Sequence, residues 1–377
     1  MNVIMKRILS IILMFSMVFS MAGCANNGTK ASSDNSNAKI TIVDNNGDKV
    51  ILPKDVKRIV VADILPLPSV LCAFFDSAEK IVGISPVSMS AAKNGLLGQL
   101  YPEILKADTS FINGSEVNNE ELLKLKPDVV FYSASSKELG TQLKNSGFNA
   151  VAVSVNKWNY NTIETLNKWI ALLSQIFPNN DKTETVKNYS SKVYDMVQKR
   201  VAGIPDSKRA RVFFLFQYSG TKITTSGKLF FGQFWADAVG AVNVAEELKT
   251  DNSVNVNMEQ IYKWNPDIIF MTNFTSSQPE DLYKNVVGTY NWSKISAAQN
   301  KKVYKMPLGI YRSYTPGADT PMTLLWLAKT VYPDLFSDID LNQQVKDYYK
   351  TVFGVELTKE QVASIFAPTS NSAGGIK

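Results

Sequence analysis

The sequence predicts a mixed α/β protein built from two similar lobes, and two observations support this fold class. Short apolar segments that are typical of buried strands alternate with segments of helical periodicity, as in a largely parallel sheet covered by helices. One phrase also occurs twice, as "NNEELLKLKPDVVFYSAS" at residues 118–135 and as "NMEQIYKWNPDIIFMTNF" at residues 257–274. We therefore expect each Rossmann-like lobe to contain the same helix-to-strand unit, with its Pro-Asp step acting as turn chemistry.

The first 23 residues are typical of an export signal, because Lys6 and Arg7 precede an apolar run that ends at small residues. The run is shorter than the roughly 20 apolar residues of a membrane span. Ala22 and Gly23 directly before Cys24 resemble the lipobox of bacterial lipoproteins. That resemblance implies a lipid on the Cys24 thiol and anchoring to the cell membrane. The alternative is an ordinary signal peptide with an incidental cysteine.

Residues 24–38 are rich in Asn and Ser, have almost nothing to bury, and are expected to form a flexible tether. The first α/β lobe is then expected at 39–178. It should begin with a β-hairpin around Asn45-Asn46-Gly47, since Asn-Gly between alternating apolar residues is a hairpin signal. Strands are expected at 57–63, 80–85, 128–133 and 150–155, and helices at 69–76, 120–125 and 137–146.

The lobes are expected to be joined by a linking helix within 179–205. Its apolar residues recur at intervals of three and four and predict one amphipathic helix that ends near Gly203 and Pro205. At 1.5 Å per residue, residues 181–202 would measure about 33 Å, enough to connect two lobes. A helix of this kind is also common inside an ordinary core. The apolar positions are Val186, Tyr189, Val193, Met196, Val197 and Val201.

The second α/β lobe is expected at 206–377, ending in helices and a short tail. The pattern of the first lobe restarts here. Strands are expected at 211–216, 267–271 and 302–306, and helices at 232–239 and 258–264.

Composition excludes several classes of function. The chain contains no histidine, which excludes Ser-His-Asp and Cys-His catalytic sets and imidazole metal ligands. Its net charge of +6 is too mild to indicate a nucleic-acid partner. Cys72 is the one cysteine besides Cys24, and we expect it to be buried. A surface hydrolase on an α/β scaffold remains the alternative, although no G-x-S-x-G motif is present.

Five segments together resemble the substrate-binding lipoproteins of ABC importers for iron-siderophore, haem and cobalamin, the helical-backbone class of periplasmic binding proteins. The similarity covers roughly residues 39–366. The segments that carry it are "DNNGDKVILPKDVKRIVV", the two Pro-Asp phrases, "TTSGKLFFGQFWADAVGAVNVAEEL" and "LFSDIDLNQQVKDYYKTVFGVELTKEQ".

The resemblance implies a non-enzymatic, extracytoplasmic protein whose two lobes are joined by a long helix and hold the ligand between them. It also implies that a surface glutamate on each lobe docks the ABC permease dimer, which works with a cytoplasmic ATPase. These glutamates correspond to Glu120 and Glu259. Equal carboxylates on two similar lobes suit a two-fold partner. The alternative is that they are only favourable charges at helix starts.

Ligands of open α/β sheets lie beyond the carboxyl ends of the strands, so the loops there are the candidate site. Arg312 between two tyrosines is the strongest candidate, because a guanidinium can bind an anionic oxygen while aromatic rings pack organic groups. The alternative is a surface arginine beside inward-packed tyrosines. The candidate ligand-binding residues are Leu65, Ser88, Met89, Gly114, Ser133, Thr224, Ser253, Tyr311, Arg312 and Tyr314.

The expected ligand is an Fe(III) chelate, most simply a ferric siderophore, with no intrinsic cofactor. Gly114, Ser133 and Ser253 stand where corrinoid-binding relatives tend to place tryptophans, which weakens the cobalamin alternative. Haem remains an alternative through Tyr311, Tyr314 or Met89 as iron ligand. A nickel or cobalt chelate is a further alternative. A sensing or ligand-sequestering role is also compatible with the sequence.

Overall fold

The computed structural model describes residues 38–114 and 116–376, which lie within one compact unit, Ser36–Lys377. The predicted signal peptide, Cys24 and the tether up to residue 37 lie outside the described residues. Within the described part, no helix is long and apolar enough to cross a membrane.

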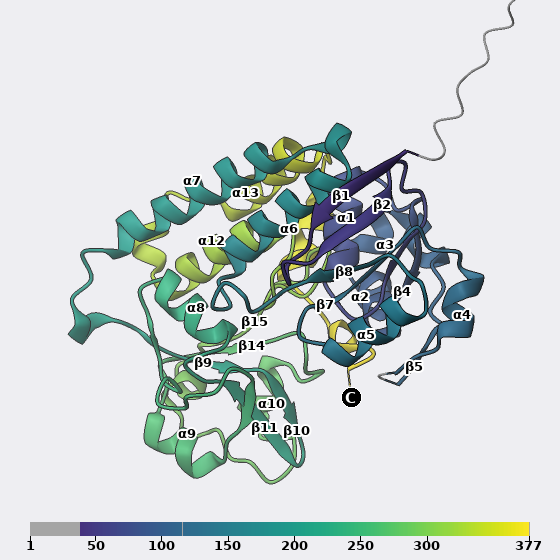
Figure 1. The fold of residues 1–377 in the computed structure, drawn as a ribbon. Coiled ribbons are helices and arrows are strands. Elements are labelled where there is room, and N and C mark those ends of the chain that lie inside the picture. Colours follow the sequence, from purple (N-terminus) through teal and green to yellow (C-terminus); the bar gives the residue numbers. More distant parts are fainter. Residues whose placement is uncertain (1–37, 115, 377) are drawn as a thin grey trace, which may run out of the picture. The chain divides into compact units, whose positions relative to one another are not determined.

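Two four-stranded parallel sheets form the centres of the two lobes (Figure 1). In each sheet the second strand along the chain lies at one edge, followed by the first, third and fourth strands. This shared order confirms the predicted duplication. The first sheet contains β3 (Ile59–Val61), β4 (Ile81–Ile84), β7 (Val129–Ser133) and β8 (Ala150–Val153), and the second contains β9 (Arg211–Leu215), β12 (Val242–Asn243), β14 (Ile268–Met271) and β15 (Val303–Lys305).

The repeated phrase has the same structural role in both lobes. The carboxylate of Asp128 accepts hydrogen bonds from the backbone N–H groups of Lys57 and Arg58, at 2.7 and 2.8 Å. The carboxylate of Asp267 accepts one from the N–H of Arg211, at 3.0 Å. Each aspartate therefore joins the start of the third strand to the start of the first by hydrogen bonds. We call this contact the aspartate latch. The Pro-Asp step thus joins neighbouring strands in addition to making a turn.

Asparagine caps begin the repeated helices α4 (Asn119–Lys124) and α9 (Met258–Trp264). The side chain of Asn118 accepts from the N–H groups of Glu120 and Glu121, and that of Asn257 accepts from Gln260. Such caps satisfy N–H groups that the helix itself leaves without partners.

The remaining elements cover the sheets. The predicted hairpin is present as β1 (Lys39–Val43) and β2 (Lys49–Pro53), and the predicted helices appear as α1 (Leu67–Phe75), α5 (Lys137–Asn145) and α8 (Phe231–Ala238). The sequence patterns did not predict the antiparallel sheet of β10 (Gln217–Ser219), β11 (Lys222–Ser226) and β13 (Ser253–Asn255). Further elements are α2 (Pro86–Asn94), α3 (Leu97–Leu100), β5 (Ile112–Asn113), β6 (Glu116–Val117), α10 (Pro279–Lys284), α11 (Ser296–Gln299) and α14 (Lys359–Phe366), with short 3₁₀ turns at Pro102–Lys106, Pro178–Asn180, Asp206–Lys208, Pro333–Phe336 and Ser370–Ala373.

The predicted linking helix is present as α7 (Thr183–Val201) and lies in a layer of helices (Figure 1). It packs against α6 (Thr162–Ile176) and α12 (Thr320–Val331), and α13 (Leu341–Tyr348) packs on α12 before a π-helical turn at Tyr349–Phe353. One hydrophobic cluster runs from the first lobe through this layer into the second lobe. The buried residues of α7 are Val186, Ser190, Val193, Val197 and Val201, whereas Tyr189 and Met196 are half-buried.

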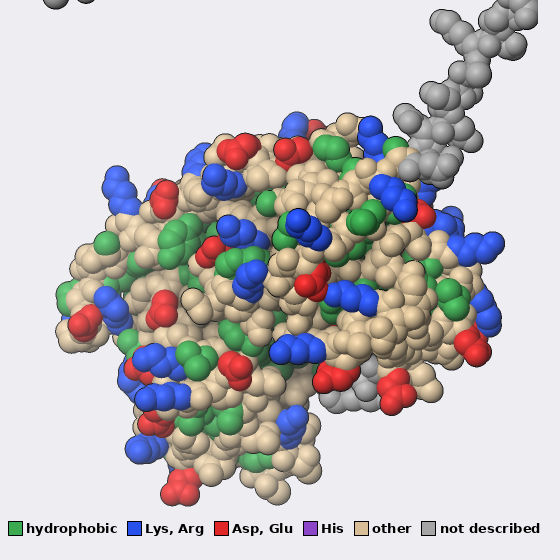
Figure 2. All heavy atoms as spheres, viewed as in Figure 1, with side chains coloured by type: hydrophobic (Ala, Val, Ile, Leu, Met, Phe, Trp, Pro, Cys, Tyr) green, Lys and Arg blue, Asp and Glu red, His purple; other side chains and the backbone are tan. Residues whose placement is uncertain are grey.

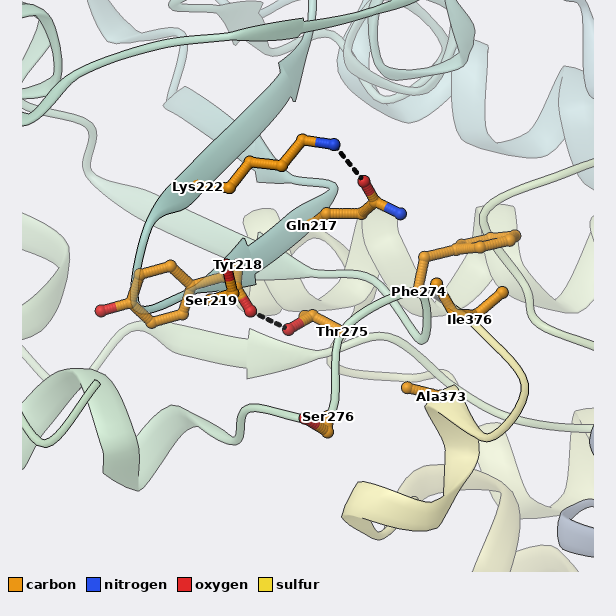
Figure 3. Close-up of a pocket in the computed structure, with 9 residues that line it drawn as sticks. All are labelled: Gln217, Tyr218, Ser219, Lys222, Phe274, Thr275, Ser276, Ala373 and Ile376. Carbon is orange, nitrogen blue, oxygen red and sulfur yellow. Dashed lines mark hydrogen bonds between the residues drawn. The ribbon is translucent and has the colours of Figure 1, made fainter. Parts of the chain in front are cut away.

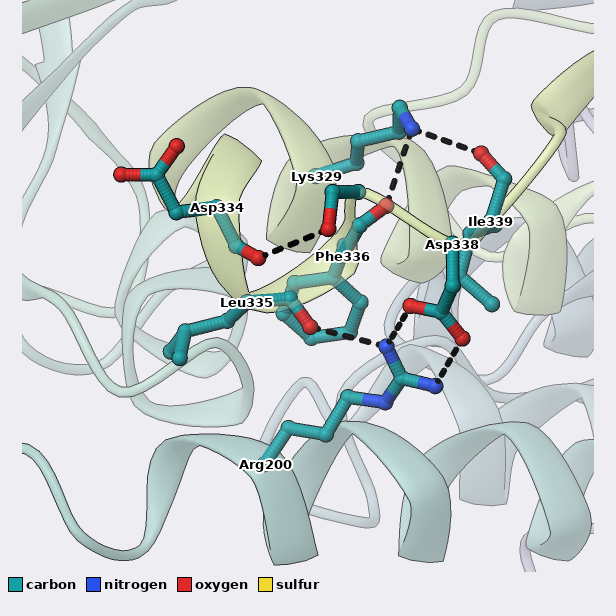
Figure 4. Close-up of polar contacts among 8 residues, drawn as sticks. Arg200, Lys329, Asp334, Leu335, Phe336, Asp338 and Ile339 are labelled. Carbon is teal, nitrogen blue, oxygen red and sulfur yellow. Dashed lines mark hydrogen bonds and ion pairs between the residues drawn. The ribbon is translucent and has the colours of Figure 1, made fainter.

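A polar clamp holds the end of α7 against the turn that follows α12 (Figure 4). The two terminal guanidinium nitrogens of Arg200 donate to the two carboxylate oxygens of Asp338, at 2.5 and 2.8 Å. One of these nitrogens also donates to the carbonyl of Leu335. Lys329 donates to the carbonyls of Phe336 and Ile339. The hydrogen bond from Arg200 lowers the pKa of Asp338 to about 2.

Charged side chains are interspersed over the face shown in Figure 2, where Lys and Arg alternate with Asp and Glu. This distribution agrees with the mild net charge of +6.

Candidate ligand cleft

A cavity of about 690 Å³ lies beyond the carboxyl ends of strands from both sheets. Loops after β3, β4 and β7 supply its first-lobe wall, and residues after β9 and β14 supply its second-lobe wall. This is where open parallel sheets bind ligands. The lining residues are Ala62, Asp63, Leu65, Ser85, Pro86, Val87, Ile112, Gly114, Val117, Ser136, Gln217, Phe274, Gly375 and Ile376.

A smaller hollow of about 250 Å³ adjoins the first on the second-lobe side (Figure 3). The two hollows share Gln217, Phe274 and Ile376 as lining residues. Polar groups from the β10–β11 hairpin and from the loop after β14 complete the smaller hollow. Its remaining lining residues are Tyr218, Ser219, Lys222, Thr275, Ser276 and Ala373.

The larger cavity is mainly apolar, with a few polar groups at fixed positions. The carboxylate of Asp63 accepts from the backbone N–H of Ser133 and the hydroxyl of Ser136, both at 2.5 Å. The side-chain oxygen of Gln217 accepts from Lys222, at 3.2 Å. An apolar wall with few oriented polar groups is the usual composition of a small-molecule site.

Leu65 and Gly114 are the two predicted ligand-binding residues that line the cavity. Ser88 supports that wall, because its hydroxyl donates to the carbonyl of Leu65 at 2.8 Å. Ser133 supports it through its bond to Asp63. Met89 is buried on α2 and packs in the hydrophobic cluster, away from the lining. In the first lobe the structure therefore brings Leu65, Gly114, Ser88 and Ser133 together.

In the second lobe the predicted residues lie behind the cavity wall. Thr224 is buried on β11, and its hydroxyl accepts from the N–H of Gln217 at 3.0 Å. Ser253 lies one strand further away, where β13 pairs with β11. Tyr311 and Tyr314 are buried, and neither lines either hollow. Thr224 thus positions a lining residue, while the two tyrosines pack inside the lobe.

Arg312 is 1% exposed. Its guanidinium forms hydrogen bonds with backbone carbonyls of a segment that lies far along the chain. Its Nε donates to the carbonyl of Ser372 at 2.9 Å, and one terminal nitrogen donates to the carbonyl of Gly374 at 2.8 Å. The other terminal nitrogen donates to the hydroxyl of Tyr311, at 3.3 Å. The guanidinium also lies 5.4 Å from the centre of the Phe274 ring, on the second-lobe cleft wall. The guanidinium is therefore adjacent to the cleft but covered.

A buried carboxylate fixes the loop that carries Arg312. Asp319 accepts hydrogen bonds from the N–H of Ile310, at 3.0 Å, and from the hydroxyl of Tyr349. Burial raises the pKa of Asp319 to about 6, and these hydrogen bonds limit the rise. Gly309 makes the close approach possible, since a Cβ there would lie 2.4 Å from the Asp319 carboxylate.

The patterns missed several lining residues: Asp63, Gln217, Phe274 and Ile376. Asp63 and Gln217 could have been found, because each lies at or just after the end of an expected strand and bears a polar side chain. Ile376 carries no local signal, since its position depends on where a segment after the last helix returns.

Glu120 and Glu259 are exposed in the first turns of α4 and α9, at equivalent places in the two lobes. Cys72 is fully buried, as expected. Among the described residues, no group of three or more Cys, Asp or Glu side chains is arranged to hold a metal ion.

Comparison with known proteins extends this picture. The sequence profile described as "Periplasmic binding protein" matches residues 75–308, more than half of the chain. The chain belongs to the periplasmic binding protein family. It is accordingly a solute-binding protein of an ABC transporter and not an enzyme, as predicted. Proteins of this kind act outside the cytoplasm and work with an ABC permease and its ATPase.

Similar proteins differ in their ligands. A periplasmic solute binding protein from Veillonella parvula has a solved structure with 30% identity and a TM-score of 0.78, over 89% of this chain and 98% of that one. The molybdate-binding protein MolA of Haemophilus influenzae is 26% identical over 347 residues, which cover 85% of this chain and 93% of MolA. The Fe(3+)-citrate-binding protein YfmC of Bacillus subtilis is 22% identical, over 79% of this chain and 87% of YfmC.

Proposed function

We propose that this periplasmic binding protein captures a metal complex that carries its own organic ligands, with a ferric chelate as first choice. The observation that supports this is the cavity of about 690 Å³ between the strand ends of the two sheets. Pockets of roughly 300–1,000 Å³ with apolar walls hold drug-sized molecules. A ferric chelate with carboxylate or other anionic oxygens fits that size, and its charge would suit the adjacent Arg312.

Other chelates are less well supported by the cleft. Tyr311 and Tyr314 lie off the walls of both hollows, so neither is placed to ligate haem iron. Met89 is also absent from the lining. A nickel or cobalt chelate is compatible with the volume but has no dedicated partner in the cleft.

Molybdate is a second candidate, because MolA aligns with 85% of this chain. Against it, an oxyanion of five atoms would leave most of a 690 Å³ cavity to water. The measured affinities for the two kinds of ligand decide between them.

The decisive experiment is calorimetry on purified residues 25–377. Ferric citrate, ferric siderophores, haem, cobalamin, nickel and cobalt chelates and sodium molybdate are titrated under the same conditions. We expect a dissociation constant in the micromolar range or below for a ferric chelate, and at least 100-fold weaker binding of molybdate. Tight binding of molybdate alone, or of no compound, would refute the proposal.

We further propose that Cys24 carries the lipid anchor. Cys24→Ala is then expected to move the protein from the membrane fraction to the soluble extracytoplasmic fraction. Membrane retention of the variant at the wild-type level would remove the lipobox assignment.

Delivery is proposed to use Glu120 and Glu259 as docking charges for the permease. The double variant Glu120→Lys/Glu259→Lys should bind the ligand normally but abolish uptake of labelled ligand by cells, since the lysines would repel the arginine pockets that the family resemblance implies on the permease dimer. Glu121→Lys/Gln260→Lys is the matched control, because it changes charge on the neighbouring residues of the same helices. Normal uptake with the double variant would show that the glutamates are only helix-start charges.

A further inference from the structure

Residues 370–376 return to the cleft and form part of its wall. We call this segment the strap. It begins with the 3₁₀ turn Ser370–Ala373 and continues through two glycines to Ile376. Ala373 lines the smaller hollow, Gly375 lines the larger one, and Ile376 lines both. Figure 3 shows Ile376 beside Phe274, with Ala373 on the turn that precedes it. The strap therefore forms part of the wall of both hollows.

Beneath the strap lies a buried positive charge without an acidic partner. No ion pair found among residues 38–114 and 116–376 involves Arg312, and its guanidinium donates to the carbonyls of Ser372 and Gly374. Buried charges are normally paired with an opposite charge. Hydrogen bonds from a guanidinium to an ionised oxygen are roughly twice as strong as those to a neutral one. An anionic ligand would therefore be a better partner for Arg312 than the strap carbonyls.

The strap packs closely against the first lobe, but some of the buried polar groups around it lack hydrogen-bond partners. A Cβ at Gly374 would lie 2.4 Å from the Ser90 hydroxyl, and Gly375 adopts a positive φ of 78° next to the same residue. The buried hydroxyls of Ser372 and Ser313 have no hydrogen-bond partner among the described atoms. Unsatisfied buried hydroxyls weaken the seated arrangement. The strap thus fits closely against α2, but the buried hydroxyls without partners make this seated arrangement less stable.

We propose that the strap is an intramolecular competitor of the ligand, covering Arg312 until an anionic oxygen of the ligand takes over the guanidinium. This inference rests on the proposed capture of an anionic chelate. The ligand can reach Arg312 only in molecules whose strap is displaced. The apparent dissociation constant is therefore the intrinsic constant divided by the fraction of molecules in which the strap is displaced. The strap also favours anionic solutes over neutral ones, since a neutral solute gains no contact with Arg312 by displacing it.

The test begins without ligand, using phenylglyoxal, which modifies accessible arginines, and mass spectrometry of the Arg312 peptide. In the wild-type protein Arg312 is expected to be protected. Gly374→Ala should unseat the strap by collision with Ser90, raise the modification rate of Arg312 at least tenfold and speed amide exchange in residues 370–376. Adding Ser90→Ala removes the colliding hydroxyl and should restore protection. Gly203→Ala is the control, because nothing lies within 4 Å of a Cβ there.

A second variant unseats the strap by a different route. Gly375→Val places a β-branched residue at a φ of +78°, which such residues avoid. It should expose Arg312 as Gly374→Ala does. If either variant folds with the wild-type melting temperature and a mobile strap while Arg312 stays unreactive, the strap is not its cover and the proposal fails. Rapid modification of Arg312 in the wild-type protein would overturn it equally.

The ligand arm uses ferric citrate and, in parallel, sodium molybdate. Ferric citrate should protect Arg312 of Gly374→Ala from phenylglyoxal and should bind this variant on the order of tenfold more tightly than wild type. In the wild-type protein it should speed exchange of the strap while slowing exchange in residues 62–65. Slower exchange in both places would make the strap a fixed wall and refute competition. If the variants expose Arg312 but neither probe protects it, the strap covers the arginine as inferred and the proposed function is what fails.

Discussion

The first lobe supplies most of the wall of the larger cavity, whereas the second lobe lines it with two residues and buries the loop that follows β15. Ten of the fourteen residues lining the larger cavity come from the first lobe, two come from the second and two from the strap. Yet the strand order and the aspartate latch are the same in both lobes. A shared architecture therefore fixes where the cleft lies but leaves each lobe free to use its loops differently.

In the second lobe, the loop after β15 buries two charged side chains. Arg312 and Asp319 are both buried on or beside residues 307–320, and each is satisfied mainly by backbone groups and tyrosine hydroxyls. The first-lobe wall carries Asp63 at its surface, already bonded to Ser133 and Ser136. We infer that the first lobe shapes the ligand site and the second supplies its charge.

The largest expected effect concerns the buried carboxylate behind the Arg312 loop. Burial raises the pKa of Asp319 from 3.8 to about 6 in the folded protein, so folding binds a proton between these values. The contribution of Asp319 to stability should therefore fall as pH rises from about 4 to about 6, by about 3 kcal/mol if the unfolded value is ordinary. The measurement is urea unfolding between pH 4 and 7. Asp319→Asn should lose this component, and an unchanged pH profile in that variant would place the titration elsewhere.

The next effect tests the close approach in the same loop. Gly309→Ala should destabilise the protein by about 2 kcal/mol, because its Cβ would lie 2.4 Å from the Asp319 carboxylate. Gly317→Ala is the matched control, since the nearest atom to a Cβ there is 4.0 Å away. Thermal unfolding of both variants at pH 7 gives the comparison. Equal stability of the two would show that the loop is not constrained by Asp319.

The smallest effect compares the two latches directly. Asp128 accepts two backbone N–H groups and Asp267 accepts one. Asp128→Ala should therefore cost about 1.5 kcal/mol and Asp267→Ala about 1 kcal/mol, because the first loses two hydrogen bonds to a carboxylate and the second loses one. Denaturant unfolding measures both. A larger loss at Asp267 would contradict the latch as the source of the difference.

The sequence was sufficient for the elements whose patterns are local. Strands β7 and β14 were predicted because continuous apolar runs follow a Pro-Asp step, and α7 because its apolar residues recur with helical spacing. The β10–β11–β13 sheet was missed, since "QYS", "KITTS" and "SVN" are too polar and short to indicate strands. For such segments, local composition is a weak predictor of strand formation, and pairing with neighbouring strands in the folded protein determines the structure.

The site was predictable only in part, for the same reason. Leu65 and Gly114 follow or precede recognisable strands, and both line the cavity. The placement of Arg312 depends on carbonyls 60 and 62 residues further along the chain, in a segment with no pattern of its own. The motif "GIYRSYTPG" indicates a guanidinium near aromatic rings, but not the strap that covers it.

A crystal structure of the protein with bound ferric citrate tests the central claim most directly. We predict ligand density between Leu65 of the first lobe and Phe274 of the second, an anionic oxygen within hydrogen-bond distance of Arg312, and residues 372–376 displaced from that guanidinium. A ligand bound outside this cleft, or bound within it while Arg312 still donates to Ser372 and Gly374, would contradict the account.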